Sequence, residues 1–159
     1  MNWKSKVAVV LGTFLVLAIC GSQTAYAAPA ADACSLLPAS QIQKVLGQPF
    51  GAPAESKWPP AYGKQPWGTQ CQYDSQKSPN TKVTFIVYIE QTAAEAKQTF
   101  DKLSMWFPAK SKPAIGDAAY MDNSHAIHVL KGKVRYYISI DPANEKQAKD
   151  LATSIAGRI

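Results

Sequence analysis

The sequence has few of the residues from which catalytic sites are usually built. It contains two histidines and three cysteines in 159 residues. It has no Gly-x-Ser-x-Gly or Ser-x-x-Lys motif, so the familiar arrangements that activate a serine nucleophile are missing. It also has no Cys-x-x-Cys pair, which argues against the common zinc and dithiol sites. We therefore expect a protein that is not an enzyme and that uses no metal ion or other cofactor.

The hydrophobic stretch at the N-terminus is too short to span a bilayer. It covers 13 residues, 7–19, whereas a spanning helix needs roughly 20. Two lysines precede it, and it is followed by an Ala-x-Ala site at Ala25 and Ala27. This arrangement predicts a signal peptide over residues 1–27 that is cleaved after Ala27, so we expect a secreted or periplasmic protein.

A second processing signal overlaps the first. The segment Leu17-Ala-Ile-Cys-Gly21 resembles a lipoprotein box, in which Cys20 would be acylated and would tether the protein to a membrane. The residue before such a cysteine is normally small, and Ile19 is β-branched. We therefore expect no lipid at Cys20 and no stable membrane anchor after cleavage.

Cleavage leaves residues 28–159, a length typical of a single domain. This segment contains two cysteines, Cys34 and Cys71. Exported proteins fold in oxidising compartments, where an even number of cysteines usually pairs. The sequence therefore predicts a disulfide between Cys34 and Cys71.

Positive charge is in excess but is spread along the chain. Without the two lysines that precede the hydrophobic stretch, 15 basic and 11 acidic residues remain, a net charge of +4. Such a charge favours an anionic surface, an envelope glycan or an acidic protein as partner. No run of four basic residues occurs, and export fits poorly with nucleic acid, so we expect no nucleic-acid partner.

Hydrophobic periodicity predicts an α+β domain, in which an antiparallel sheet of about five strands is flanked by three helices. Helices are expected after Pro38, from the Thr92–Glu95 capping box to Phe107, and in the segment that ends at Ile159. Strands are expected over 69–74, 82–90, 118–121, 125–130 and 134–140.

Residues 48–70 show no hydrophobic period and predict a long Pro/Trp-rich loop. The loop carries four candidate binding residues, Trp58, Tyr62, Lys64 and Trp67. Tryptophan and tyrosine offer large rigid surfaces, and neighbouring lysines add charge, which suits a protein or sugar partner. Aromatic rings in loops are often buried, however, so a lid over the core is favoured slightly over a binding surface for these residues.

The two histidines form a His-x-x-His pattern that is found in metal sites. Residues three apart on a strand point to opposite faces, so His125 and His128 would not share an ion in the strand expected here. A structural or surface role is favoured for both. Asp117, in an Ile-Gly-Asp turn, is expected to accept hydrogen bonds from neighbouring backbone amides.

Four short motifs are similar to those of the LpqN-like secreted domains of bacteria. They are Cys34-Ser-Leu-Leu37, Val45-Leu-Gly47, Cys71-Gln-Tyr73 and Ile115-Gly-Asp-Ala-Ala-Tyr120. The resemblance spans most of the segment after the signal peptide. It implies a PsbP-like α/β sandwich with a disulfide between the first helix and a strand, and a binding role without enzymatic activity.

Three functions remain open at this point. The first is a non-enzymatic extracytoplasmic binding module for a protein or a cell-envelope component, which acts through residues 57–70 and the adjoining sheet surface. The second is a periplasmic inhibitor or immunity protein that blocks a toxin or a hydrolase. The third is a hydrolase whose site forms only on folding, and this requires His125 or His128 beside carboxylates in a concave cluster.

Overall fold

The computed structural model describes residues 32–58 and 68–159. The helices are α1 (Ala33–Leu36), α2 (Ala39–Leu46), α3 (Ala93–Trp106) and α4 (Glu145–Ala156). The strands are β1 (Ala54–Trp58), β2 (Gly68–Asp74), β3 (Lys82–Ile89), β4 (Ala109–Ser111), β5 (Ala118–Asp122), β6 (Ile127–Lys131) and β7 (Val134–Asp141).

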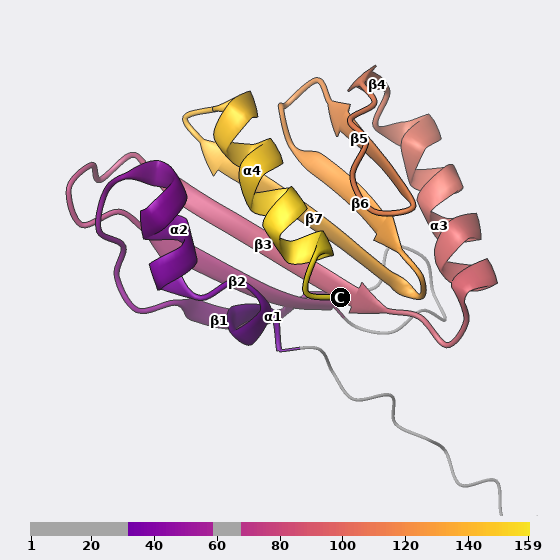
Figure 1. Cartoon of the computed structure of the whole chain (residues 1–159), viewed down its shortest axis with the longest axis horizontal. Helices are drawn as coiled ribbons and strands as arrows, with labels where there is room; N and C mark the ends of the chain where they lie inside the picture. Colours follow the sequence, from indigo (N-terminus) through magenta and orange to yellow (C-terminus); the bar gives the residue numbers. More distant parts are fainter. Residues whose placement is uncertain (1–31, 59–67) are drawn as a thin grey trace, which may run out of the picture.

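The strands form one seven-stranded sheet in the order β1-β2-β3-β7-β6-β5-β4. Every neighbouring pair is antiparallel. Helices α2 and α4 cross in front of the strands in Figure 1, while α3 lies toward the β4–β5 end. The structure therefore confirms the α+β class and the antiparallel sheet.

One face of the sheet, which we call the inner face, packs against α1, α2 and α4. Strand β3 contributes Val83, Phe85 and Val87 to this core, each at most 1% exposed. Apolar residues of α4 belong to the same core cluster. The Tyr136 hydroxyl of β7 donates a hydrogen bond to the Ala152 carbonyl of α4 at 2.6 Å. Alternation along each strand is the reason that these residues share one face.

The opposite, outer face is covered by α3 at the β5–β6 end of the sheet. The capping box predicted for this helix is present, with Thr92 and Glu95 each accepting from the backbone of the other. A second apolar cluster lies beneath the helix, and it includes the edge-to-face pair of Phe100 and Tyr120, 5.2 Å between ring centroids.

Within residues 32–58 and 68–159, the sheet is larger than the five strands expected, and there are four helices where three were expected. The additional strands β1 and β4 are short edge strands. Residues 54–57 of β1 are exposed and those of β4 are largely exposed, so no apolar alternation marks these residues. The additional helix, α1, is a single turn capped by the Asp32 carboxylate. The prediction of one continuous loop over 48–70 is wrong, because β1 and the start of β2 lie within it.

Two local expectations about turns are also wrong. His125 does not begin a strand: it lies in the turn before β6 with φ at 65°. Asp117 does not bind the amides of its own turn. Its carboxylate accepts from the backbone N–H of Gly132 at 2.6 Å, and thereby links the start of β5 to the β6–β7 hairpin.

The predicted Cys34–Cys71 disulfide is present, with the Cα atoms 5.3 Å apart. It joins α1 to β2. The Tyr73 hydroxyl, two residues further along β2, donates to the Leu37 carbonyl. Burial, with a smaller contribution from Asp32, raises the pKa of Tyr73 to about 12, so this hydroxyl stays protonated.

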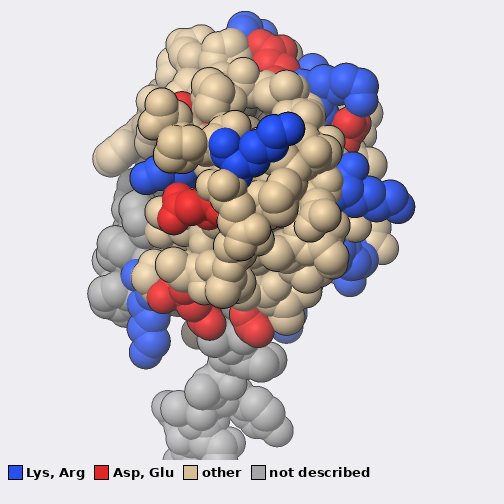
Figure 2. All heavy atoms as spheres, turned by 90° about the vertical axis from the view of Figure 1, so that its left-hand side faces the viewer, with Lys and Arg blue, Asp and Glu red and all other residues tan. Residues whose placement is uncertain are grey.

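The surface carries both signs of charge. On the side of the molecule shown in Figure 2, basic and acidic side chains are interspersed. Among the described residues, no helix is both long and apolar enough to cross a membrane. A disulfide is typical of proteins from oxidising compartments, whereas the predicted signal peptide and its cleavage site at Ala25 and Ala27, like Cys20, lie outside the described residues.

Replacing both Cys34 and Cys71 by alanine is expected to lower the free energy of unfolding by about 4 kcal/mol, because the 37-residue separation is no longer closed in the unfolded chain. Urea denaturation of the oxidised protein and the variant measures the difference. The reduced wild-type protein is the control and should unfold close to the variant. Equal stability of the oxidised protein and the variant would contradict this expectation.

Candidate functional site

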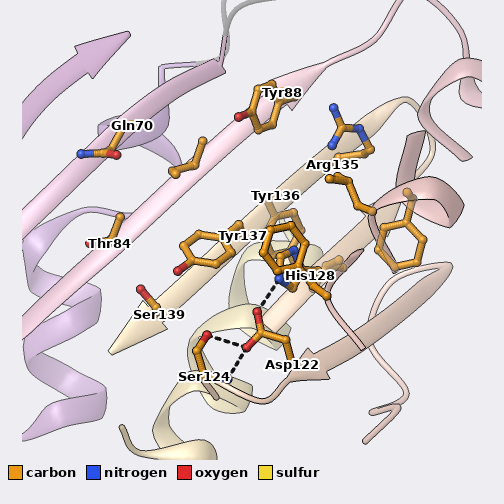
Figure 3. A pocket seen from close by; sticks show the side chains of 15 residues that line it. Gln70, Thr84, Tyr88, Asp122, Ser124, His128, Arg135, Tyr136, Tyr137 and Ser139 are labelled. Carbon is orange, nitrogen blue, oxygen red and sulfur yellow. Dashed lines mark hydrogen bonds and ion pairs between the residues drawn. The ribbon is translucent and has the colours of Figure 1, made fainter. Parts of the chain in front are cut away.

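A pocket of about 450 Å³ opens between α3 and the outer face of the sheet. One wall is formed by Phe100 and Leu103 of α3 and by Phe107, the residue that follows this helix. The floor and the far end come from β2, β3, β6, β7, the end of β5 and the β5–β6 turn. Their residues are Gln70, Thr84, Ile86, Tyr88, Asp122, Ser124, His128, Val129, Arg135, Tyr136, Tyr137 and Ser139 (Figure 3).

Strand register places much of the floor in one row across the sheet. Tyr120 pairs with His128, and His128 pairs with Tyr137. The row continues through Ile86 of β3 to Gln70 of β2. Side chains of directly paired residues lie on the same face, so the row runs from the cover of α3 into the open part of the face.

His128 lies at the centre of an aromatic cluster. Its ring is parallel to the ring of Tyr120, with centroids 4.5 Å apart and a 10° angle between the planes. Phe107 stacks at 5.7 Å, and Tyr137 meets the imidazole edge to face at 5.1 Å. These contacts leave His128 9% exposed and hold its ring in one orientation.

The Asp122 carboxylate also holds the orientation of the His128 ring. His128 Nε2 lies 2.9 Å from Asp122 Oδ2. Asp122 Oδ1 accepts from the Ser124 hydroxyl at 2.6 Å, from the Ser124 N–H at 2.9 Å and from the Ala126 N–H at 3.1 Å. The turn after β5 therefore wraps its backbone and one hydroxyl around the carboxylate (Figure 3).

The protonation states follow from these surroundings. Burial works to raise the pKa of Asp122, but the hydrogen bonds from Ser124, His128 and Ala126 together lower it, so the carboxylate is ionised. Burial lowers the pKa of His128 below its usual 6.5, with a smaller contribution from Arg135, and outweighs the opposing effect of Asp122. At neutral pH the pair is an ionised carboxylate beside a neutral imidazole.

A second charged pair lies at the pocket and is almost completely buried. Arg135 Nε and one terminal guanidinium nitrogen lie 2.9 Å and 2.6 Å from Glu90 Oε1. The guanidinium carbon also lies 4.7 Å from the centroid of the Tyr88 ring. A buried charge needs such partners, and Glu90 neutralises Arg135 here. Burial raises the pKa of Tyr88 to about 12, so its hydroxyl is uncharged at neutral pH.

The two histidines have different surroundings and do not share a site. His125 Nδ1 lies 2.9 Å from Glu145 Oε1 on α4, beside Lys110, whereas His128 lies in the pocket. Among the described residues, three or more acidic, histidine or cysteine ligand atoms come together only at Asp32, Cys34 and Glu55. The Cys34 sulfur of that group is bonded to Cys71, so it is not available as a thiolate ligand.

The structure describes little of the four binding residues that were proposed from the sequence. Trp58 ends β1, while Tyr62, Lys64 and Trp67 lie outside the described residues. Sequence reasoning missed Asp122, Phe107 and Arg135 as site residues. A signal for Arg135 was present, since it begins the polar alternation Arg135, Tyr137, Ser139 on an otherwise apolar strand.

Comparisons with known proteins assign no family. A scan against models of protein families finds no match, and a search of curated proteins finds no relative. The resemblance to LpqN-like domains therefore stays a prediction based on four short motifs.

Replacing Asp122 by asparagine is expected to lower the pKa of His128 further, because the carboxylate that opposes the effect of burial is removed while the burial remains. NMR titration of the imidazole signals measures the change. Ser124→Ala is the control, since it removes a hydrogen-bond donor but keeps the carboxylate. A higher pKa in Asp122→Asn would contradict the expectation.

The free energy of unfolding is expected to fall as the solution is acidified below about pH 6.5. The pKa of His128 is lower in the folded protein than in the unfolded chain, where it is 6.5. Its contribution to the free energy of unfolding is therefore complete above pH 6.5 and is lost as the pH falls through the pKa of the folded protein. Urea denaturation across this range measures the slope. His128→Gln should flatten it, and an unchanged slope would assign the effect to other groups.

Proposed function

We propose that this protein is a non-enzymatic extracytoplasmic binding module and that the pocket on the outer face is its ligand site. The observation that carries this proposal is the composition of the pocket. Its walls are mostly aromatic and aliphatic, and a few polar side chains are held in fixed positions among them. Pockets for small ligands usually combine an apolar lining with a few oriented polar groups.

The pocket lies on the sheet surface that adjoins residues 57–70, since Gln70 of β2 is part of its floor. The proposal therefore keeps the binding role expected from the sequence but assigns it to a defined concave surface. The ligand is a small molecule or one group of a larger envelope component. The alternative function, a periplasmic inhibitor or immunity protein, would require a protein partner at this face.

A hydrolase is the second candidate, because His128 and Asp122 form the concave histidine–carboxylate pair that this hypothesis requires. Such a pair becomes a nucleophile-activating system when the histidine also faces a hydroxyl or thiol. The Ser124 hydroxyl donates to Asp122. Because this hydroxyl is directed to the carboxylate and not to the imidazole, the contacts favour a binding role.

Filling the pocket is expected to abolish binding. Ser139 lines the pocket from β7 and is half-buried, so the indole of Ser139→Trp would occupy the open volume. We expect this variant to bind the neutral fluorescent probe N-phenylnaphthylamine at least about tenfold more weakly than the wild-type protein, because the ligand loses its buried apolar contact. Fluorescence titration measures both affinities.

The matched control is Ser40→Trp, which adds the same side chain at an exposed position of α2. Helix α2 packs with the inner-face core, away from the pocket. This variant should bind the probe as the wild-type protein does. The proposal fails if the folded wild-type protein does not bind the probe, or if both tryptophan variants bind it equally well.

A further inference from the structure

One nitrogen of His128 makes no hydrogen bond within the described residues. Nε2 lies 2.9 Å from the Asp122 carboxylate, and this is the hydrogen bond that the ring makes there. The His128 side chain keeps 11% of its surface exposed and lines the pocket, so the other ring nitrogen, Nδ1, is the polar atom of His128 that is left for a ligand.

The Asp122 carboxylate decides the chemical character of Nδ1. An ionised carboxylate accepts hydrogen bonds only, so the imidazole proton resides on Nε2. A neutral imidazole with its proton on Nε2 has a lone pair on Nδ1. At neutral pH the pocket therefore presents a hydrogen-bond acceptor that is held in place by Asp122 and by the stacked ring of Tyr120.

The charges of the pocket disfavour an anionic ligand. Arg135 is paired with Glu90, and both are almost completely buried, so this pair offers no net positive charge. Asp122 adds a negative charge, and the neutral imidazole does not compensate it. A carboxylate or phosphate that entered the pocket would lose hydration without gaining a counter-ion.

Asp122 also offers little to a cationic ligand, because both of its oxygens already accept hydrogen bonds. Oδ1 accepts from Ser124 and Ala126, and Oδ2 is paired with His128. The rings of Phe107 and Tyr137, which both line the pocket, lie beside the His128 imidazole. Flat apolar groups pack against such rings by stacking or edge-to-face contact.

From this geometry we propose that the pocket selects uncharged planar ligands that carry a hydrogen-bond donor, the class of the phenols. In this proposal His128 Nδ1 accepts a hydrogen bond from the hydroxyl group of the ligand. This inference rests on the proposed function, because it names the ligand class of the same pocket. It makes His128 a specificity-determining residue.

The test compares three ligands with the same ring system: naphthol, its methyl ether and naphthoate. Each is titrated into the full mature protein at about pH 7.5, where a phenol is uncharged and a carboxylic acid is ionised. Two-dimensional amide NMR reports the affinity and the place of binding. We expect naphthol to bind about five- to tenfold more tightly than the methyl ether, which corresponds to one hydrogen bond, and naphthoate to bind most weakly.

Two variants test the role of Nδ1. His128→Gln extends an amide toward the Nε2 position beside Asp122 and leaves the Nδ1 position empty, whereas His128→Asn places an amide group near the Nδ1 position. The ratio of the naphthol and methyl-ether affinities should fall to about one in His128→Gln and should stay above one in His128→Asn. Loss of stacking affects both ligands equally, so this ratio isolates the hydrogen bond. His125→Asn, at the histidine outside the pocket, is the control and should keep the wild-type ratio.

The results separate the two proposals. If naphthol and its methyl ether bind in the pocket with equal affinity, the ligand class is wrong while the binding role stands. If none of the three ligands shifts the pocket amides, both proposals fail. A wild-type ratio in His128→Gln would exclude Nδ1 as the acceptor. Should a His128 variant fail to fold, the comparison of the three ligands on the wild-type protein still decides the inference.

Discussion

The architecture depends on covering both faces of one sheet. Strands direct alternate side chains to opposite faces, and here both faces carry apolar residues that must be removed from water. The inner face is closed by α1, α2 and α4, and the Cys34–Cys71 disulfide ties α1 to β2. Of the described helices, α3 alone is left for the outer face, and it covers the β5–β6 end. The pocket lies where this cover stops, over β2, β3 and β7.

The polar residues of the pocket follow from the same constraint. A charge that is removed from water requires a partner, and Arg135 of β7 pairs with Glu90, the residue that follows β3. Asp122 is satisfied by its own turn and by His128. These pairs orient side chains and leave one imidazole nitrogen of His128 without a hydrogen bond to the described residues. An oriented acceptor among aromatic rings is suited to recognising a ligand.

Sequence patterns predicted the elements whose signals are local. The alternation of Val83, Phe85 and Val87 identified β3, and the Thr92–Glu95 capping box marked the start of α3. The edge strand β1 was missed because its exposed side chains show no such pattern, and its pairing with β2 is not a local property. Asp117 was assigned to its own turn, but it binds Gly132 because folding brings a hairpin next to that turn.

The amino-acid sequence by itself determined the α+β class, the inner faces of the central strands and the pairing of Cys34 with Cys71, since these depend on periodicity and on the number of cysteines. The tertiary structure alone decided the site. His128 and Asp122 are six residues apart, and Glu90 and Arg135 are 45 apart. Each pair meets through the folding of the turn or the register of the strands, and α3 reaches the same place from another part of the chain. The pocket is a product of contacts between distant segments, and no pattern along the chain records such contacts.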